Sequence, residues 1–335
     1  MRNREVVLVA RPLGIAQAEH FAIRDAPVVA PGPGEITVRN RYLSVEPAMR
    51  GWIADTGGYS DPVAIGEAMR SLAAGEVVES RHPLFAPGDH VMGWFGWRDR
   101  ATVPAGRVVR RTPREELRAS LGVLGLTGVT ALLALTRVGE PRPGETVVVS
   151  TAAGAVGSTV GQIARIMGCR AVGIAGGPDK ARACVERYGY DAAIDYRGED
   201  VGARVGALCP DGVHVYFDNT AGAISDAVLP HLAVGARVVV CGTASVSRWN
   251  EWPVGPRVER HLLVKRARMQ GFVVFDHLHG FEEAVATLRG WLADGGLVAD
   301  EDVLNGLEAC PDALAGLYRG ENRGKRLIRL VEDEG

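Results

Sequence analysis

Cysteine and lysine are the scarce residues of this 335-residue sequence. Its five cysteines begin only at Cys169, and no two of them form a Cys-x-x-Cys pair. The sequence therefore predicts neither a disulfide framework nor a cysteine-rich zinc lobe. Only three of the 38 basic residues are lysines, Lys180, Lys265 and Lys325, so the place of each lysine is more informative than usual.

An excess of one charge and a long apolar run are also lacking. The 38 basic and 40 acidic residues give a formal net charge of −2, which argues against the basic field that nucleic-acid and membrane-surface binders need. The uncharged stretches that approach the ~18 residues of a membrane-spanning helix, at 119–136 and 146–164, are interrupted by serine, threonine and glycine, so no membrane-spanning helix is expected. The first apolar run ends at Arg11 and is too short for a signal-peptide core. We expect a cytoplasmic protein whose partner is a small-molecule substrate, not a nucleic acid or a membrane.

Two regions of the chain differ in their hydrophobic pattern. Up to about residue 120, alternating runs are separated by proline and glycine, which predicts a small β-barrel-like domain with strands at 5–10, 35–43 and 75–80. After that point short apolar strands alternate with helices, which is typical of a doubly wound parallel sheet in an α/β domain. The tail from Pro311 to Leu330 holds a helix and a strand that we expect to return to the first domain.

The second region has a regular order of predicted elements. Its strands are expected at 146–150, 170–176, 191–196, 213–219, 236–242 and 269–276. Its helices are expected at 156–168, 179–188 and 281–295, and a further helix is expected between the fourth and fifth strands, ending near Gly235.

A glycine turn follows the first strand of the second region. The sequence from Ser150 to Gly157 reads STAAGAVG, an AxGxxG variant of the dinucleotide fingerprint with Ala152 in place of its first glycine. Gly154 lets a pyrophosphate approach the backbone, Gly157 permits close helix–strand packing, and the helix N-terminus attracts anions. The alternative is a glycine-rich turn that binds nothing, but its place between a strand and a helix favours a nucleotide site.

The end of the second strand indicates which cofactor binds. NAD sites carry an acidic residue there for the ribose 2′-hydroxyl. Here the strand ends Ile174-Ala175-Gly176-Gly177 and Lys180 follows, which leaves room and a positive charge for a 2′-phosphate. The sequence therefore predicts NADPH as the cofactor, with an ordinary solvated lysine as the alternative.

Several longer motifs resemble those of one family. They are RYLSVEPAMRG (41–51), FAPGDHVMGWFGW (85–97), LGVLGLTGVTA (121–131), AAGAVGSTVGQIARIMGCRAVGIAGGPDK (152–180), AIDY (193–196), FDNTAG (217–222), RARMQGFVVFDH (266–277) and GENRGKRLI (320–328). The chain resembles the medium-chain dehydrogenase/reductase superfamily, in its zinc-free branch of leukotriene dehydrogenases/prostaglandin reductases, curcumin reductases and plant double-bond reductases. The resemblance implies a GroES-like β-barrel domain at 1–121 and 303–335 and a Rossmann domain at 122–302, with the site in the cleft between them and a homodimer formed through the edge of the Rossmann sheet.

The resemblance also implies a set of cofactor-binding residues. Lys180, Tyr196 and Asn322 would serve the 2′-phosphate region, and Phe272 and Val274 the nicotinamide. The full set is Thr130, Ala152, Gly154, Ala155, Val156, Gly157, Lys180, Tyr196, Asn219, Gly242, Phe272, Val274 and Asn322. Without the resemblance, Asn219 is an ordinary strand-end residue, and the aromatic and apolar members are packing residues.

A metal site is not expected. Zinc-dependent relatives use a cysteine and a Gly-His-Glu set in the first domain, whereas this chain has no cysteine there and reads IGEAMRS at 65–71. Thiolates and clustered imidazoles, the usual zinc ligands, are therefore missing from the sequence positions where they would stand.

The chemistry that suits such a site is reduction of a conjugated double bond. Hydride addition to the β-carbon of an enone or enal places charge on the carbonyl oxygen, which needs positioning and a hydrogen-bond donor. Many relatives supply pocket tyrosines where this chain has Ala48 and Glu259. Arg50 and Tyr59 are further pocket candidates, with structural roles as their alternative, and no catalytic residue is assigned.

Three functions stay open on these grounds. The first is the NADPH-dependent reduction of an α,β-unsaturated ketone or aldehyde. The second is quinone reduction or a secondary-metabolite tailoring reduction on the same scaffold. The third is NADPH binding without turnover.

Overall fold

The computed structural model describes residues 3–55, 58, 60–246 and 251–330. Contacts divide these residues into two compact units. The first holds the described residues up to Gly122 and from Glu301 onward, and the second holds Val123–Val246 and Trp252–Asp300. One unit is thus built from both ends of the chain and the other from its middle.

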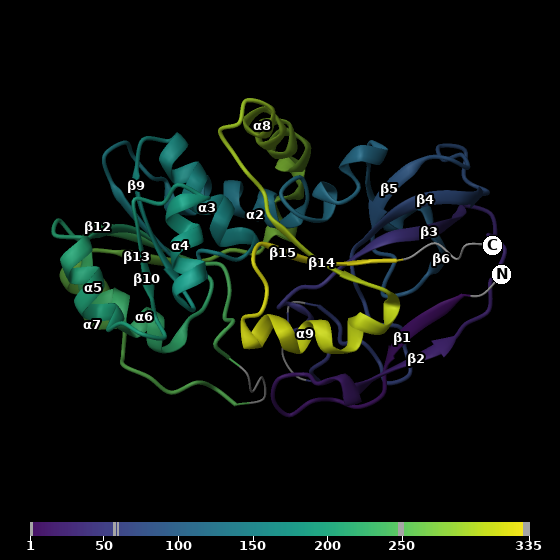
Figure 1. Cartoon of the computed structure of the whole chain (residues 1–335), viewed down its shortest axis with the longest axis horizontal. Helices are drawn as coiled ribbons and strands as arrows, with labels where there is room; N and C mark the ends of the chain where they lie inside the picture. Colours follow the sequence, from purple (N-terminus) through teal and green to yellow (C-terminus); the bar gives the residue numbers. More distant parts are fainter. Residues whose placement is uncertain (1–2, 56–57, 59, 247–250, 331–335) are drawn as a thin grey trace. The chain divides into compact units, whose positions relative to one another are not determined.

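The first unit is built mainly of antiparallel strand pairs, apart from the parallel pair that its two strands nearest the C-terminus form (Figure 1). A two-stranded sheet pairs β1 (Arg4–Leu8) with β2 (Phe21–Asp25). The larger sheet has the order β14 (Glu301–Asn305), β15 (Lys325–Arg329), β3 (Glu35–Ser44), β4 (Ala73–Ser80), β5 (His90–Gly93) and β7 (Val108–Arg111), with β6 (Arg100–Pro104) also paired to β3. Because β15 is antiparallel to β3, the C-terminal tail completes the sheet that the N-terminal strands begin.

The helices of the first unit close its core. The short α1 (Met49–Trp52) and the longer α9 (Cys310–Arg319) contribute apolar side chains to one buried cluster with the strands. In α9 the buried residues Cys310, Ala313 and Leu314 recur at the spacing of one helical face. This cluster includes Trp97 and Phe95, both almost fully buried.

The second unit is a six-stranded parallel sheet between helices. Its order is β10 (Ala192–Asp195), β9 (Arg170–Ala175), β8 (Thr146–Ser150), β11 (Val213–Asp218), β12 (Leu232–Val240) and β13 (Arg268–Gly271). Numbered along the chain, these strands have the 3-2-1-4-5-6 order of the dinucleotide-binding fold. The order of the strands in the sheet changes direction between β8 and β11, although all six strands are parallel. Every residue of β8 is buried, as expected of a central strand covered on both faces.

Helices cover both faces of the parallel sheet. They are α2 (Leu126–Ala134), α3 (Ala155–Ile166), α4 (Pro178–Glu186), α5 (Val201–Leu208), α6 (Gly222–Val228), α7 (Glu259–Lys265) and α8 (Phe281–Ala293). In Figure 1, α5, α6 and α7 gather on one side of the strands, whereas α2 and α3 lie on the other. Helices α2 and α3 contact each other, as do α5 and α6.

Two predicted elements of the second unit differ from the structure. The helix expected to run to a stop near Gly235 ends as α6 at Val228 with one further 3-10 turn, and Gly235 lies inside β12 with φ +77°. The pairing of β11 with β12 shifts register around it, so the glycine serves a bulge and not a helix end. The strand expected at 269–276 stops at Gly271, because its partner β12 ends at Val240 and a 3-10 segment follows from Val274.

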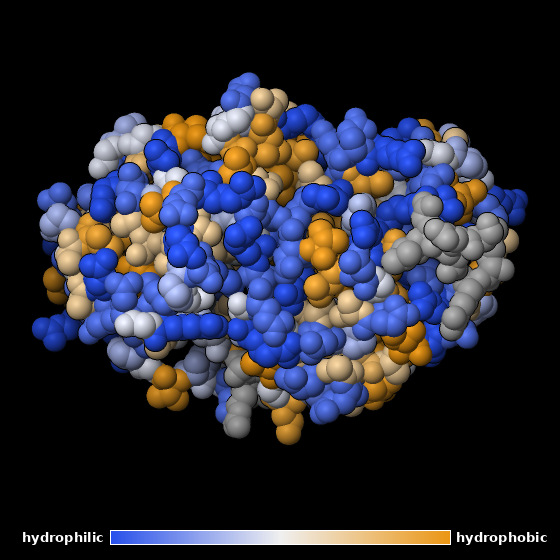
Figure 2. Space-filling model, viewed as in Figure 1, coloured by the Kyte–Doolittle hydropathy of each residue, from blue (hydrophilic) through white to orange (hydrophobic). Residues whose placement is uncertain are grey.

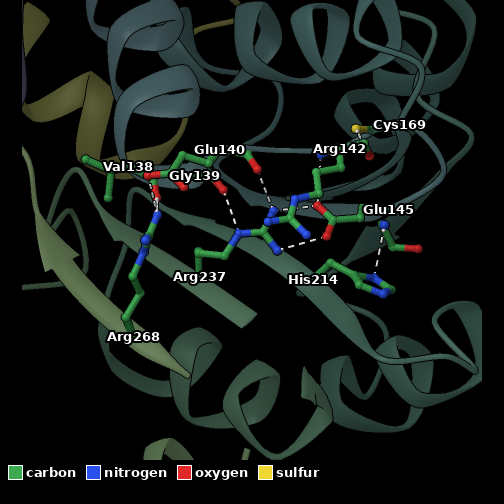
Figure 3. Close-up of polar contacts among 10 residues, drawn as sticks. Val138, Gly139, Glu140, Arg142, Glu145, Cys169, His214, Arg237 and Arg268 are labelled. Carbon is green, nitrogen blue, oxygen red and sulfur yellow. Dashed lines mark hydrogen bonds and ion pairs between the residues drawn. The ribbon is translucent and has the colours of Figure 1, made fainter. Parts of the chain in front are cut away.

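The amino ends of the parallel strands carry an almost buried ion pair, which Figure 3 shows. The side chains of Arg237 and Glu145 are 11% and 15% exposed and form a two-pronged contact. Arg237 also donates to the carbonyl oxygens of Gly139 (2.8 Å) and Glu140 (2.7 Å). Burial alone would raise the pKa of Glu145, but hydrogen bonds from Arg237 and from the amide of Arg142 bring it below its ordinary value.

The outer surface mixes residue types. On the face seen in Figure 2, hydrophilic residues predominate and hydrophobic ones form separate small groups. Within the described parts of the chain, no helix combines the length and the hydrophobicity that crossing a membrane requires.

Candidate functional site

The glycine turn joins β8 to α3 in a tightly packed arrangement. Thr151 is exposed and has φ +54°, which turns the chain sharply after the buried strand. A Cβ atom at Gly157 would lie 2.2 Å from the carbonyl oxygen of Thr151 and 2.9 Å from the Cα of Ala152. Only glycine fits there, and α3 consequently starts directly against the end of the strand.

The first turn of α3 presents its amides at that strand end. Gly154 is the N-cap of the helix, and its own N–H donates to the carbonyl oxygen of Thr151 at 2.9 Å. The next N–H groups of a helix have no partner within the helix and carry the positive end of its dipole. Ala155 and Val156 are partly exposed, whereas Ala152 is fully buried. The turn is therefore suited to bind an anion such as a pyrophosphate.

A second polar turn lies at the end of β9. Gly177 has φ +100° and is the N-cap of α4, and Lys180 lies partly exposed in the first turn of that helix. Tyr196 follows β10, is 41% exposed, and places its ring against Gly176, where a Cβ atom would lie 2.7 Å from the tyrosine hydroxyl oxygen. The structure thus brings two of the three residues expected at a 2′-phosphate, Lys180 and Tyr196, onto neighbouring turns.

A carboxylate that the sequence did not single out also reaches this turn. Asp195, the last residue of β10, accepts hydrogen bonds from the amides of Gly177 and Arg197. Asp195 lies 18 positions beyond Gly177 along the chain, so the residues directly after β9 do not reveal it. The adjacency of β10 to β9, which the topology decides, is what brings this acid to the same place.

The end of β11 is organised by a buried carboxylate. Asp218 is 3% exposed and lies where β11 ends. Its donors are the hydroxyls of Ser150 (3.1 Å), Tyr216 (3.1 Å), Thr220 (3.2 Å) and Ser225, and the amides of Thr220 and Ala221 (both 2.9 Å). No cation is among these donors. Burial first, and then this carboxylate, raise the pKa of the Tyr216 hydroxyl, so that it stays a donor at neutral pH.

Asn219 is held next to this carboxylate. Its amide N–H donates to the Ser150 hydroxyl at 2.8 Å, and its side-chain Nδ2 donates to the Ser150 carbonyl oxygen at 2.7 Å. Gly242 packs against it, since a Cβ atom there would lie 2.9 Å from the Asn219 carbonyl oxygen. Ala221 adopts φ +58°, a strained conformation for alanine that the bonds to Asp218 maintain. Asn219 therefore stands on a rigid turn at the same edge of the sheet as the glycine turn.

The residues expected near the nicotinamide lie on three elements. Thr130 is partly exposed on α2, and Val274 is partly exposed where the 3-10 segment begins. Phe272 is 6% exposed, and its ring stacks on that of His277 with centroids 4.6 Å apart. Arg137 in turn contacts His277 through its Nη1, 3.1 Å from the imidazole Nδ1.

The pocket candidates of the first unit have structural contacts. Arg50 is 1% exposed, and its Nη2 donates to the carbonyl oxygens of Pro12 and Leu13, both at 3.3 Å. Burial lowers the pKa of Arg50. Ala48 precedes α1 and is partly exposed, and Tyr318 of α9 donates to the carbonyl oxygen of the preceding residue, Pro47, at 3.0 Å. A tyrosine that is not among the predicted site residues thus contacts this turn from α9.

The remaining candidates are placed as follows. Glu259 starts α7 at the surface, and its hydrogen bond from Arg257 lowers its pKa to about 2, so it is ionised at neutral pH. Asn322 belongs to the first unit, and its side-chain Nδ2 donates to the carbonyl oxygen of Gly324 at 2.9 Å. Tyr59 lies outside the described residues. Among the residues whose placement is described, no three His, Cys, Asp or Glu side chains come together as metal ligands would.

Comparisons with known proteins place this geometry in context. Residues 4–110 match the family described as the N-terminal domain of oxidoreductase, and residues 155–290 match the family described as zinc-binding dehydrogenase. The chain is 39% identical to the NADPH-dependent curcumin reductase of Escherichia coli over 99% of this chain and 98% of that protein. It is 34% identical to the NADP⁺-dependent 2-alkenal reductase of Nicotiana tabacum, again over 99% and 98%. The crystal structure of CurA from Vibrio vulnificus in complex with NADPH superposes with a TM-score of 0.93, at 38% identity and over 98% of this chain and 99% of that one.

Proposed function

We propose an activity from family membership: the chain belongs to the medium-chain dehydrogenase/reductase family, in the branch of the prostaglandin, curcumin and plant double-bond reductases. It uses NADPH to reduce the carbon–carbon double bond of an α,β-unsaturated ketone or aldehyde. The match to known reductases carries this proposal, and the glycine turn supports it. The chain matches reductases of that kind over nearly its whole length, and its glycine turn has the closely packed geometry that a dinucleotide pyrophosphate requires.

The residues present fit the cofactor. The first amides of α3 would hold the pyrophosphate, because the Thr151–Gly157 contact brings the helix start against the end of β8. Lys180 and Tyr196 would flank the 2′-phosphate, and Asn219 would face the dinucleotide from its rigid turn. When bound, NADPH supplies the hydride that adds to the β-carbon of the substrate.

The chain's own part in the reaction is to position the substrate and to stabilise the oxygen on which charge develops. Ala48 has no proton to give, and the ionised Glu259 cannot donate one at neutral pH. We therefore expect water to protonate the α-carbon. Burial raises the pKa of the Tyr318 hydroxyl, which keeps it protonated beside the turn that carries Ala48.

A substrate panel tests the activity directly. Purified protein is given NADPH with a set of enals, enones and quinones, and consumption of the reduced nicotinamide is followed together with product identity by mass spectrometry. We expect saturated aldehydes and ketones. Hydroquinone formation without any saturated product would replace the proposal by quinone reduction. Tight NADPH binding with no oxidation across the panel would instead indicate a binding protein.

A second proposal concerns assembly: the chain forms a homodimer through the edge of the parallel sheet. Strand β13 lies at the end of the sheet order and pairs only with β12 among the described strands. On the neighbouring α7, Leu263 is 78% and Val264 55% exposed. An open strand edge flanked by exposed apolar side chains needs a partner or protection.

Light scattering on a size-exclusion column tests the dimer. We expect a dimeric mass that Leu263→Glu shifts toward the monomer. Leu13→Glu, at an equally exposed leucine of the first unit, should leave the mass unchanged. A monomeric wild-type protein would rule the dimer out. The cytoplasmic location expected from the sequence stays a prediction.

A further inference from the structure

Asp195 joins two turns with a single carboxylate oxygen. Its Oδ1 accepts the amide N–H of Gly177 at 2.7 Å and that of Arg197 at 3.0 Å. Gly177 lies between β9 and α4, whereas Arg197 lies in the turn that follows β10. These turns are consecutive on the sheet edge, because Asp195 pairs with Ala175 as the last pair of β10 and β9. The carboxylate therefore acts as a clip between neighbouring loops.

The first of these turns sets the direction of Lys180. Gly177 is the N-cap of α4, and its carbonyl oxygen accepts the amide of Ala181 at 3.1 Å. Its φ of +100° is accessible to glycine and to few other residues, so the turn is otherwise weakly determined. The bond from its N–H to Asp195 fixes the peptide from which the helix starts. The lysine in the first turn of α4 follows that peptide.

The second turn sets the position of Tyr196. This residue lies between Asp195 and Arg197, and its own amide donates to the carbonyl oxygen of Ala175 at 3.1 Å. Its ring lies over Gly176, where a Cβ atom would be 2.7 Å from the hydroxyl oxygen and 2.9 Å from two ring carbons. The ring and the clip thus hold the same short stretch, Gly176–Gly177, from two sides.

The negative charge of Asp195 is unfavourable for binding a 2′-phosphate nearby. A carboxylate beside a bound 2′-phosphate repels it, and an acid near this position is what NAD sites use to favour the free ribose hydroxyl. Here, however, one carboxylate oxygen is engaged with two backbone amides. Its value to a phosphate site is therefore geometric.

We propose that Asp195 is a positioning residue for cofactor selection: by tying Gly177 to Arg197 it holds Lys180 and Tyr196 at the spacing that a ribose 2′-phosphate fills. This proposal rests on NADPH being the cofactor, as the proposed function has it. It does not depend on which double bond is reduced, and binding without any substrate can test it.

The decisive variant is Asp195→Ala. Dissociation constants for NADPH, NADH and the fragment 2′,5′-ADP are measured by fluorescence and calorimetry on the full-length protein. The variant loses a charged acceptor for two amides, so the binding of NADPH and of 2′,5′-ADP should become about tenfold weaker. The dissociation constant for NADH, which has no 2′-phosphate, should change less than about twofold. Equal weakening of NADPH and NADH, or no change in either, would overturn the proposal.

Asp195→Asn separates geometry from charge. An asparagine oxygen can still accept both amides while the negative charge is gone, so this variant should bind NADPH at least as tightly as the wild type. If it lost NADPH affinity as the alanine variant does, the geometric role would be wrong. The matched control is Asp191→Ala, which removes a similar bond at the other end of the same strand pair, from the amide of Ala171 to the Asp191 carboxylate at 2.8 Å. That control should leave the preference for NADPH over NADH unchanged.

Gly176→Ala provides a second route if Asp195→Ala fails to fold. The added methyl group meets the far end of the exposed Tyr196 side chain, which can swing away without disturbing the core. It should reproduce the selective loss of NADPH affinity, and an unchanged preference would contradict the proposed positioning. If the enzyme reduced no enone, only the proposed activity would be contradicted. The role of Asp195 would still be testable, because these binding measurements contain no substrate.

Discussion

The two ends of the parallel sheet use buried charge in opposite ways. At the amino ends of the strands, Arg237 and Glu145 satisfy each other, and the remaining guanidinium donors go to backbone carbonyl oxygens (Figure 3). At the carboxyl ends, Asp218 and Asp195 accept hydrogen bonds from backbone amides, and Asp218 also accepts from hydroxyl groups.

The difference explains which end can hold a ligand. At the amino ends Arg237 and Glu145 bind each other and nearby carbonyl oxygens, so we expect this end of the sheet to have a structural role. Carboxylates that hold backbone amides make turns rigid, and those turns leave the start of α3 and the first turn of α4 facing outward. This matches the general rule that ligands of such sheets bind beyond the carboxyl ends, where the strand order reverses.

The largest expected effect comes from removing the ion pair at the amino ends of the parallel strands. Arg237→Met leaves Glu145 almost buried without its partner, which should cost roughly 4 kcal/mol of unfolding free energy. Denaturant unfolding measures this, and the double variant Arg237→Met/Glu145→Leu should recover much of the loss. The Kd for NADPH of the folded protein should not change. A tenfold weaker NADPH would contradict the separation of the two ends.

The next effect concerns the glycine turn at the carboxyl end. Gly157→Ala places a methyl group 2.2 Å from a backbone oxygen that cannot move away cheaply, which should cost about 3 kcal/mol and abolish measurable NADPH binding. Gly290→Ala is the matched control, since nothing lies within 4 Å of its added Cβ atom in the middle of α8. That variant should bind NADPH normally and gain up to about 1 kcal/mol from helix propensity. Normal NADPH binding by Gly157→Ala would mean that the turn is not the dinucleotide site.

A smaller effect is expected from Asp218→Asn. The amide keeps one acceptor oxygen but cannot satisfy the donors on both sides of the carboxylate, which should cost about 2 kcal/mol of stability. The amides of Thr220 and Ala221 both donate to Oδ1, which the asparagine oxygen replaces, so the turn that carries Asn219 is kept and the affinities for NADPH and NADH should both stay within about twofold. Titration of both nucleotides checks this. A selective loss of NADPH would show that Asp218 acts on the 2′-phosphate side instead.

Lys180→Ala should change cofactor choice with little effect on stability. Removing the cation beside a 2′-phosphate should weaken NADPH about tenfold and NADH hardly at all, since their only difference is that phosphate. Lys265→Ala, at the end of α7, is the control of the same residue type. Equal effects on the two nucleotides would overturn the cofactor assignment.

The smallest effect is a pH dependence at the amino end. The folded pKa of Glu145 lies below its ordinary value of 4.5, so the pair's contribution is complete above that pH and is lost as the pH falls through the lower folded value. Unfolding measured from neutral to acid pH should show this decline, and Glu145→Gln should make the curve flatter over the same interval. Parallel curves for the two proteins would show that the pair is not what acid breaks.

The type and approximate bounds of many helices and strands could be predicted from the local hydrophobic pattern of the sequence. The buried strand at 146–150 and the helix at 281–295 have the expected type and nearly the expected bounds, because hydrophobic periodicity over such lengths reflects which face is buried. The predicted ends of β13 and of the helix before Gly235 are wrong. The length of a strand depends on the length of its partner, and a glycine can form a bulge in a strand as well as end a helix. The glycine turn and Lys180 are predicted from the local sequence, whereas Tyr196 and Asn219 follow only from the family resemblance, because they lie on other strand ends; their binding roles stay predictions.

The sequence by itself determined the alternation of strands and helices, the glycine turn, and the absence of an acid directly after β9. These are properties of neighbouring residues, and short-range sterics and periodicity suffice to read them. Only the tertiary structure decided that Asp195 reaches Gly177 from the next strand, and that Asp218 gathers Ser150, which is 68 positions away. Strand order and register bring such groups together, and they follow from the packing of the whole sheet, to which every strand contributes and which no single segment encodes.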